Sequence, residues 1–363
     1  MTQFLLKQRK ATKKKPPLLA SRQDTKNWKV AVLANLYYEQ LSPLDPPDKG
    51  GDYDSVETIE RICNILAAEG HTVEFIHADM ELPKHVTKFK PDICFNIAEG
   101  SQGDSREAQV PAFLELMGIP YTGSRVLTNA IALDKSLTKV IWQQAGLPVA
   151  PWQILFDVKE ALSRHLSFPL IVKPSQEGSG MGLDPDSVVY DETQLRKQVS
   201  KIVLRYHQPA MVEKFLPGRE FTVCILGHSG ANIRRPEFYD DQGFHYLPIM
   251  EISVPSTNAL ICDFAIKHVD DDKATPASLS PEFSQLLYDY VRRGHHAIGA
   301  LDISRTDIRC DEQGQPYLLE INPLPGLSKN SHIPSMFRFS GISYDQLILE
   351  ILYLGAERYG LRR

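Results

Sequence analysis

The stretch RTDIRCDEQGQPYLLEINP, residues 305–323, contains two strand-like runs separated by the polar segment DEQGQ at 311–315. A turn at this segment would close the runs into a β-hairpin, so that Asp307 and Glu320 lie on neighbouring strands. Glu320 and Asn322 are two residues apart and project from the same face. Carboxylate and amide oxygens suit Mg²⁺, although the same residues would also suit a solvent-facing strand surface. The stretch predicts a candidate metal site on one face of a hairpin.

A glycine-rich stretch, SQEGSGMG at 175–182, follows the apolar run FPLIVKP at 168–174. It is not a Walker A loop, because no Gly-Lys-Ser/Thr follows, and it lacks the GxGxxG spacing of a dinucleotide fold. Its backbone N–H groups could cradle phosphate oxygens, and Lys173 could neutralise one of them. The alternative is a flexible turn.

The region after Trp28 alternates between strand and helix patterns, which predicts an α/β fold with an open parallel sheet. A helix is expected at 55–70, with Ser55 as N-cap and Gly70 as C-cap. The loop at 39–54 is long and rich in Pro, Gly and Asp, and such loops are often functional. The predicted strands are KVAVLAN (29–35), HTVEFIHA (71–78) and DICFNIA (92–98). Residues 229–282 show no regular pattern.

Several single residues have two interpretations. Arg106 and Glu107 could contact substrate or cap the helix that follows them. Tyr37 and Tyr38, beside the long loop, could face substrate or close the loop over the core. The pair His295 and His296 has no third ligand at metal spacing, so a surface or packing role is expected.

Composition limits the possible classes of function. The 363 residues allow two or three domains, and 42% hydrophobic with 23% charged residues is typical of globular chains. The formal charge of -5 excludes a net positive charge of the whole protein that would attract nucleic acid or an anionic membrane. Five scattered cysteines without CxxC spacing, and no apolar run near the roughly 20 residues that span a bilayer, favour the cytoplasm. Residues 1–27 are expected to form a flexible basic tail.

Six longer strings share the pattern of a known enzyme family. Through them the chain resembles the ATP-grasp ligases, and within these the D-Ala-D-Ala ligase branch, over nearly all of residues 28–363. The strings are FNIAEG, LELMGIPYTGS, ALDKSLTKVIWQQAGLPVAPW, FPLIVKPSQEGSGMG, VEKFLPGREFTVCILG and YLLEINPLPGLS. The resemblance implies a three-domain ATP-grasp fold with an N-terminal open α/β domain. The expected divisions are a tail at 1–27, an N-terminal substrate domain at 28–124, a central ATP-grasp subdomain at 125–213 and a C-terminal ATP-grasp subdomain at 214–363.

The resemblance also implies roles around ATP. Lys135 and Lys173 would contact its phosphates, with Ser179 of the glycine-rich stretch beside them. The adenine would lie on the strand that contains Glu213, Lys214 and Leu216, and Glu220 would hold the ribose. Lys267 would reach the γ-phosphate. Asp307, Glu320 and Asn322 would hold two Mg²⁺ ions, for which Mn²⁺ is a possible substitute.

Roles on the substrate side follow from the same resemblance. Arg305 and the backbone of Gly326 would steady a tetrahedral centre, and Ser331 would bind the carboxylate of the incoming amino acid. Departures from the family pattern cluster on this side, whereas the ATP and metal positions are intact. The family's GGxSxE-type loop is replaced by ANLYYEQLSPLDPPDKGGDYDS (34–55), its His by Glu99, a loop serine by Gly180 and a tyrosine by His268, and His332 follows Ser331 where an apolar residue is usual. Ser331, Glu99 and His268 are therefore the expected substrate contacts.

The predicted function is an ATP- and Mg²⁺-dependent C–N ligase that joins a phosphorylated acid or vinylogous acid to the amine of an amino acid. Because buried partners of D-alanine are replaced, a pair other than two D-alanines is expected, with mycosporine-glycine plus serine or threonine as one possibility. The alternatives are an authentic D-Ala-D-Ala ligase and a nucleotide-binding module without ligation. The expected partners are a small-molecule acid and an amino acid, with no nucleic acid and no membrane, in a homodimer.

Overall fold

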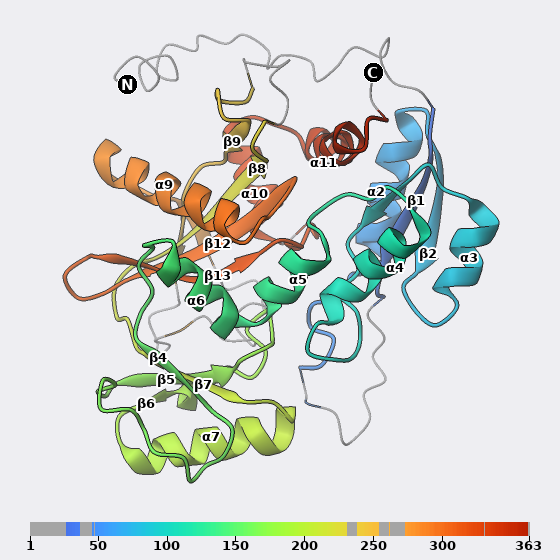
Figure 1. The fold of residues 1–363 in the computed structure, drawn as a ribbon. Coiled ribbons are helices and arrows are strands. Elements are labelled where there is room, and N and C mark those ends of the chain that lie inside the picture. Colours follow the sequence, from blue (N-terminus) through green and yellow to red (C-terminus); the bar gives the residue numbers. More distant parts are fainter. Residues whose placement is uncertain are drawn as a thin grey trace.

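The computed structural model describes residues 27–36, 46, 48–230, 238–253, 261, 273–329 and 331–361. It is a mixed α/β structure with three sheets, each with helices packed beside it (Figure 1). Lys267, His268, Tyr37 and Tyr38, for which the sequence predicts roles, lie outside the described residues. No helix within the described ranges is long and apolar enough to cross a membrane.

The first sheet is parallel with strand order β2-β1-β3, which confirms the predicted order of strand, helix and strand. Its strands are β1 (Lys29–Ala34), β2 (Thr72–His77) and β3 (Ile93–Asn96). The helices of this part are α2 (Val56–Ala68), α3 (Leu82–Phe89) and α4 (Gln109–Met117), with a 3₁₀ turn at Arg106–Ala108. Buried residues of β1 and β3 pack against α2 on one face and against α3 and α4 on the other.

Helix α2 begins as predicted, because the Ser55 side chain accepts a hydrogen bond from the backbone N–H of Thr58 at 3.2 Å. Its C-cap is Glu69, one residue earlier than predicted. Gly70 follows the cap with φ +104°, a left-handed conformation that side chains disfavour. The glycine therefore ends the helix from the position just beyond the cap.

The second sheet is antiparallel with strand order β4-β7-β5-β6. Its strands are β4 (Trp152–Leu155), β5 (Leu170–Pro174), β6 (Val188–Val189) and β7 (Ala210–Lys214). A 3₁₀ turn at Pro185–Ser187 precedes β6, and α7 (Glu192–Tyr206) follows it. Leucines and valines of the sheet and of α7 form a core of their own, separate from the cores of the other sheets.

The third sheet has six strands with the order β11-β10-β8-β12-β13, and β9 also pairs with β8. Its strands are β8 (Glu220–Gly227), β9 (Phe244–Tyr246), β10 (Met250–Ser253), β11 (Lys273–Pro276), β12 (Ile303–Cys310) and β13 (Pro316–Asn322). Helices α5 (Val126–Leu133), α6 (Lys135–Gln144) and α9 (Pro281–Ala297) supply buried residues to its core. The expectation of an irregular 229–282 was wrong for three short strands, β9, β10 and β11.

The two histidines of α9 have the roles that the sequence predicts, since His295 packs in the core and His296 lies on the surface. His295 is buried, its Nδ1 lies 2.7 Å from Ser304 Oγ, and burial lowers its pKa to about 3. A neutral imidazole therefore fills the space between α9 and β12.

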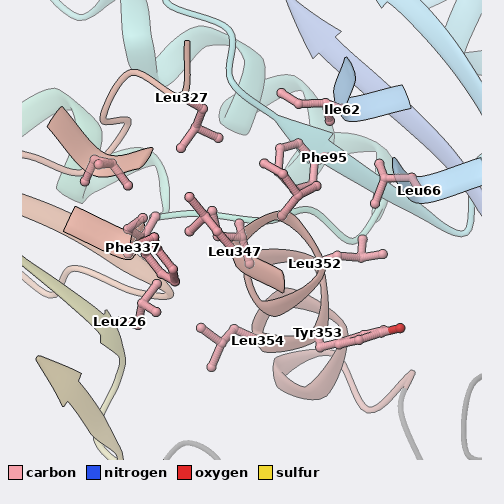
Figure 2. Close-up of a cluster of buried hydrophobic side chains, with 14 of the residues drawn as sticks. Ile62, Leu66, Phe95, Leu226, Leu327, Phe337, Leu347, Leu352, Tyr353 and Leu354 are labelled. Carbon is pink, nitrogen blue, oxygen red and sulfur yellow. The ribbon is translucent and has the colours of Figure 1, made fainter. Parts of the chain in front are cut away.

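Two C-terminal helices, α10 (His332–Ser340) and α11 (Tyr344–Arg358), join the first and third sheets. Figure 2 shows Leu347, Leu352 and Leu354 of α11 between Phe95 and the α2 residues on one side and Leu226 of β8 on the other. The N-terminal sheet and the six-stranded sheet thus share one hydrophobic core through α11. The central antiparallel sheet lies apart from it with α7 (Figure 1).

Candidate active site

The predicted hairpin is confirmed, and its strands carry the candidate metal ligands. Asp307 on β12 pairs directly with Glu320 on β13, and Arg305 pairs with Asn322. Alternation along β13 leaves Glu320 and Asn322 partly exposed and buries Ile321 between them. Two carboxylates and an amide oxygen therefore lie on one face of the sheet, as the sequence predicts.

Two neighbours fix the orientation of the Asp307 carboxylate. Arg305 donates from Nε and Nη2 to Asp307 Oδ1 and Oδ2, each at 3.1 Å, and Thr222 of β8 donates its hydroxyl to Oδ1 at 2.7 Å. Burial alone would lower the pKa of Arg305, but Asp307 and Glu320 raise it above its usual value. A fixed positive charge therefore lies beside the candidate metal ligands.

Lys135 reaches the same face from the start of α6. Asp134 caps this helix by accepting from the N–H groups of Ser136 and Leu137. Lys135 Nζ lies 3.3 Å from Glu320 Oε2 and also donates to the backbone carbonyl of Glu177, in the glycine-rich stretch. One lysine therefore links a candidate metal ligand to the segment expected to cover the phosphates.

Glu213 is the centre of a buried ion-pair cluster. It is 1% exposed, with Lys139 Nζ at 2.6 Å from Oε1 and Lys173 Nζ at 3.0 Å from Oε2. Burial raises the pKa of Glu213, but the two lysines outweigh this and hold it below its usual value. Lys139, which also donates to the Leu318 carbonyl at 3.2 Å, was missed by sequence reasoning. Its position four residues after Lys135, on the same face of α6, was the available signal.

Two adjoining cavities surround these groups. The smaller, about 90 Å³, is lined by all the predicted nucleotide contacts except Ser179: Lys135, Lys173, Glu213, Lys214, Leu216 and Glu220. The larger, about 530 Å³, is lined by Ser179, Arg305, Asn322, Gly326 and Ser331. Glu220 and Asp307 line both cavities. The candidate metal ligands therefore lie where the two cavities meet.

Ionisable side chains line both sides of the larger cavity. Lys329, Ser331 and His332 line the C-terminal side, where Ser331 Oγ shares a 2.7 Å hydrogen bond with Ser328 Oγ. The N-terminal side carries the carboxyl groups of Asp52, Asp54, Glu57 and Glu99. The N-terminal side is therefore rich in carboxyl groups, with Arg61 among them.

Two of these carboxyls have strongly perturbed pKa values. Burial, reinforced by Asp52, raises the pKa of Asp54 to about 7. Burial, reinforced by Glu107 and Asp52, raises the pKa of Glu99 well above its usual value. Within the described residues no side-chain hydrogen bond of either carboxyl is seen, and the raised pKa values favour the protonated form, so both groups are available to form hydrogen bonds with a substrate.

Arg106 and Glu107 do not cap α4, because its N-cap is Ala108 and no side chain supplies a cap bond. Arg106 instead pairs with Asp52 Oδ2 at 2.6 Å and lies 3.4 Å from Glu177 Oε2. The capping interpretation is therefore wrong, and Arg106 connects a cavity-lining residue with the glycine-rich stretch.

The oxygen ligands at the junction of the cavities fit Mg²⁺. Asp307, Glu320 and Asn322 supply two carboxylates and one amide oxygen, and no thiol or imidazole adjoins them in the pairing register. Among the described residues no cluster of three or more His, Cys, Asp and Glu side chains forms a metal site. The third ligand of the candidate set is therefore the amide oxygen of Asn322. Three protein ligands would leave coordination positions on Mg²⁺ for water and phosphate oxygens.

Comparison with known proteins identifies the family. The model of the D-ala D-ala ligase C-terminus matches residues 141–353. A D-alanine--D-alanine ligase of Carboxydothermus hydrogenoformans is 30% identical, covering 84% of this chain and 94% of its own length. The uncharacterized protein y4sG of Sinorhizobium fredii is 32% identical, covering 87% and 91%. A solved D-alanine--D-alanine ligase from Bacillus anthracis, complexed with ATP, has a TM-score of 0.70 at 22% identity, covering 92% and 99%, and shares the fold. The chain therefore belongs to the D-alanine–D-alanine ligase family of ATP-grasp enzymes.

Proposed function

We propose that this protein is an ATP- and Mg²⁺-dependent ligase that joins the amine of an amino acid to an acid or vinylogous acid other than D-alanine. The observation that carries the proposal is the meeting of two cavities at Asp307, with Arg305, Lys135 and Glu320 around the junction. Such a junction suits transfer of a phosphoryl group from a nucleotide in one cavity to an acceptor in the other.

The smaller cavity, together with its junction with the larger one at Asp307 and Glu220, would hold the nucleotide. Lys135 and Lys173 would bind its phosphates, the strand around Lys214 and Leu216 would bind the adenine, and Glu220 would bind the ribose. Asp307, Glu320 and Asn322 would hold Mg²⁺, which supplies charge neutralisation on the phosphate oxygens. We also propose that Lys267 approaches the γ-phosphate.

The larger cavity would hold the acceptor molecules. An acid oxygen would attack the γ-phosphorus and the bond to ADP would break, which would convert an acid into an acyl phosphate and a vinylogous acid into an enol phosphate. The amine of the amino acid then attacks the activated carbon and inorganic phosphate leaves. Arg305 and the backbone of Gly326 would stabilise the negative charge of the tetrahedral centre, a contribution of roughly 10² to 10³ in rate per donor. Ser331 would bind the amino-acid carboxylate.

The residues on the N-terminal side of the larger cavity favour an acid substrate other than D-alanine. Asp54 and Glu99 place two carboxyls in the cavity, at positions supplied by the replaced loop and by the substituted histidine. His268 is proposed to face the same substrate. One candidate pair is mycosporine-glycine with serine or threonine, in which ATP would activate a vinylogous acid oxygen.

The second candidate is an authentic D-alanine–D-alanine ligase. The observation in its favour is the 30% identity with the ligase of Carboxydothermus hydrogenoformans, which extends over 84% of this chain. Both candidates use the same nucleotide and metal residues, and they differ only in the acceptor.

The deciding experiment measures Mg²⁺-dependent ADP release with D-alanine alone, with single L-amino acids, and with mycosporine-glycine plus each amino acid. Turnover only with a paired acid and amino acid supports the proposal, and turnover on D-alanine alone establishes the second candidate. Glu320→Ala should abolish turnover, whereas Glu312→Ala, in the exposed hairpin turn, should leave it unchanged. An unchanged rate in Glu320→Ala would refute the metal assignment.

A further inference from the structure

The glycine-rich loop, defined here as residues 176–182, is held at both ends by side chains from the N-terminal part of the chain. Arg106 Nη1 donates to the backbone carbonyl of Gln176 at 3.2 Å, 70 residues away in sequence. The backbone N–H of Gly182 donates to Asp48 Oδ2 at 2.7 Å, 134 residues away. Both long-range contacts cross from the first sheet's domain to the central one.

Asp48 is a buried carboxylate, 6% exposed, that is satisfied by contacts outside its own turn. Besides the N–H of Gly182 it accepts from the hydroxyl of Tyr206, which lies 2.9 Å from Oδ2 and 3.1 Å from Oδ1. Removing a carboxylate from water is unfavourable unless hydrogen bonds replace the lost hydration. Asp48 therefore ties its turn firmly to the glycine-rich loop and to the end of α7.

Gly182 has a backbone that only glycine adopts comfortably here. Its φ is +78°, and an added Cβ would come within 2.3 Å of Pro174. The close packing against β5 leaves the N–H of Gly182 directed at Asp48. The end of the glycine-rich loop therefore packs against β5 and is hydrogen-bonded to the Asp48 carboxylate.

Arg106 makes the second long-range contact with the glycine-rich loop, and it also contacts a residue that lines the larger cavity. The guanidinium is buried and holds Asp52, which lines the larger cavity, together with the Glu177 side chain and the Gln176 carbonyl. Gly100 permits this arrangement, since a Cβ there would lie 2.5 Å from the Arg106 carbonyl oxygen. One side chain therefore contacts both the cavity wall and the loop.

Asp48, which accepts from Gly182, and Asp52, which pairs with Arg106, belong to one short segment of the chain. Asp48 and Asp52 flank a turn in which Gly51 N–H donates to the Asp48 carbonyl and Tyr53 N–H donates to the Gly50 carbonyl, each at 3.0 Å. The chain continues directly into Tyr53 and Asp54, which line the larger cavity. A molecule bound against this part of the wall is therefore connected to the glycine-rich loop through Asp48 and through the pair of Asp52 and Arg106.

We infer that Asp48 and Arg106 are positioning residues that couple occupancy of the acceptor cavity to the position of the glycine-rich loop over the nucleotide. The inference rests on the proposed function, in which this loop covers the ATP phosphates. Because coupling between two binding sites is reciprocal, nucleotide binding must also order the turn at 48–54. That consequence is measurable before the acid substrate is identified.

The test is hydrogen exchange measured by mass spectrometry on the full chain, with and without Mg²⁺ and the non-hydrolysable analogue AMP-PNP. In the wild type we expect slower exchange in three segments: the adenine strand at 210–216, the glycine-rich loop and the turn at 48–54. In Asp48→Ala the strand should remain protected while protection of the turn is lost. The analogue should bind about tenfold more weakly, within the range usual for coupled sites. Asp104→Ala, an exposed neighbour, should behave like the wild type.

Two further variants distinguish positioning from folding. Asp48→Asn keeps an oxygen acceptor for Gly182 and Tyr206 and should recover most of the coupling. Tyr206→Phe removes one donor only and should give an intermediate loss, which keeps the test available if Asp48→Ala fails to fold. Equal protection of the turn in wild type and variants, while the strand is protected in all, would overturn the inference. A wild type in which the strand itself gains no protection would overturn the proposed nucleotide site, and this inference with it.

Discussion

Lys139 and Lys173 bind the same buried carboxylate, yet their replacement by methionine should have different consequences. Lys139 is 0% exposed and lines neither cavity, whereas Lys173 lines the smaller one. Lys139→Met is therefore expected to affect stability, and Lys173→Met to affect nucleotide binding.

The magnitudes follow from the contacts. Removing one partner of a buried ion pair costs about 3–5 kcal/mol, and we expect the lower end for Lys139→Met because Glu213 retains Lys173 at 3.0 Å. The Leu318 carbonyl also loses a donor, worth about 1 kcal/mol. The free energy of unfolding should thus fall by roughly 3–4 kcal/mol. Losing the Lys173 contact to phosphate should cost about 1.5–3 kcal/mol, or roughly 10- to 100-fold in affinity.

The assays are urea unfolding followed by circular dichroism and calorimetric titration with Mg²⁺ and AMP-PNP. Lys159→Met, at an exposed lysine, is the control and should change neither quantity. The reasoning is refuted if Lys139→Met weakens nucleotide binding as much as Lys173→Met does while the urea midpoint stays at the wild-type value.

Three other perturbations test single contacts. Thr222→Val removes the 2.7 Å hydrogen bond to Asp307 and should weaken Mg²⁺ activation by about 10- to 100-fold. Thr222→Ser keeps a hydroxyl and should preserve Mg²⁺ activation. Equal Mg²⁺ dependence in the two variants would argue against a role of Thr222 in orienting Asp307. Gly182→Ala places a Cβ 2.3 Å from Pro174 at φ +78° and should lower the melting temperature by several degrees, which a thermal scan would detect or deny. Burial raises the pKa of Asp54 to about 7 in the folded chain. Between about pH 4 and pH 7 the folded chain therefore keeps a proton on Asp54 that the unfolded chain has lost. The contribution of Asp54 to stability falls as the pH rises through this range. Asp54→Asn should therefore melt higher than the wild type at pH 8 and equally at pH 4, and the opposite pH trend would contradict the sign.

The hairpin could be predicted from the sequence because the residues that define it lie close together in the chain. A two-residue period sets which residues of one strand share a face, and the DEQGQ turn sets which strands are neighbours. The direct pairing of Asp307 with Glu320 did not follow from spacing, because it depends on a shift of register between Asp307 and Ile308; the regular register would pair Asp307 with Leu319. The succession of strand, helix and strand also followed from local patterns, as did the Ser55 cap. Each of these elements is defined by residues within a few positions of one another.

The remaining features depend on contacts between distant parts of the chain. Strands β9, β10 and β11 have only three or four residues each, too few for a periodic pattern, and they exist because β8 and one another supply their hydrogen bonds. The contacts of Asp48 with Gly182 and of Arg106 with Gln176 join residues 134 and 70 positions apart. Neither pair has a local sequence signature, and the two candidate roles of Arg106 could be separated only by its position in space.

The sharing of a single core by the first and third sheets determines which part of the enzyme is free to swing. Helix α11 packs against both the N-terminal sheet and the six-stranded sheet that carries the candidate metal ligands, whereas the central sheet and α7 have a core of their own. Opening for product release is therefore expected to move the central sheet relative to the other two sheets, and this movement would have to break the contacts of Gly182 with Asp48 and of Gln176 with Arg106. The distance from the 48–54 turn to Asp307 is expected to change less. The turn at 48–54 can then diversify toward new substrates without disturbing the spacing on which the chemistry depends.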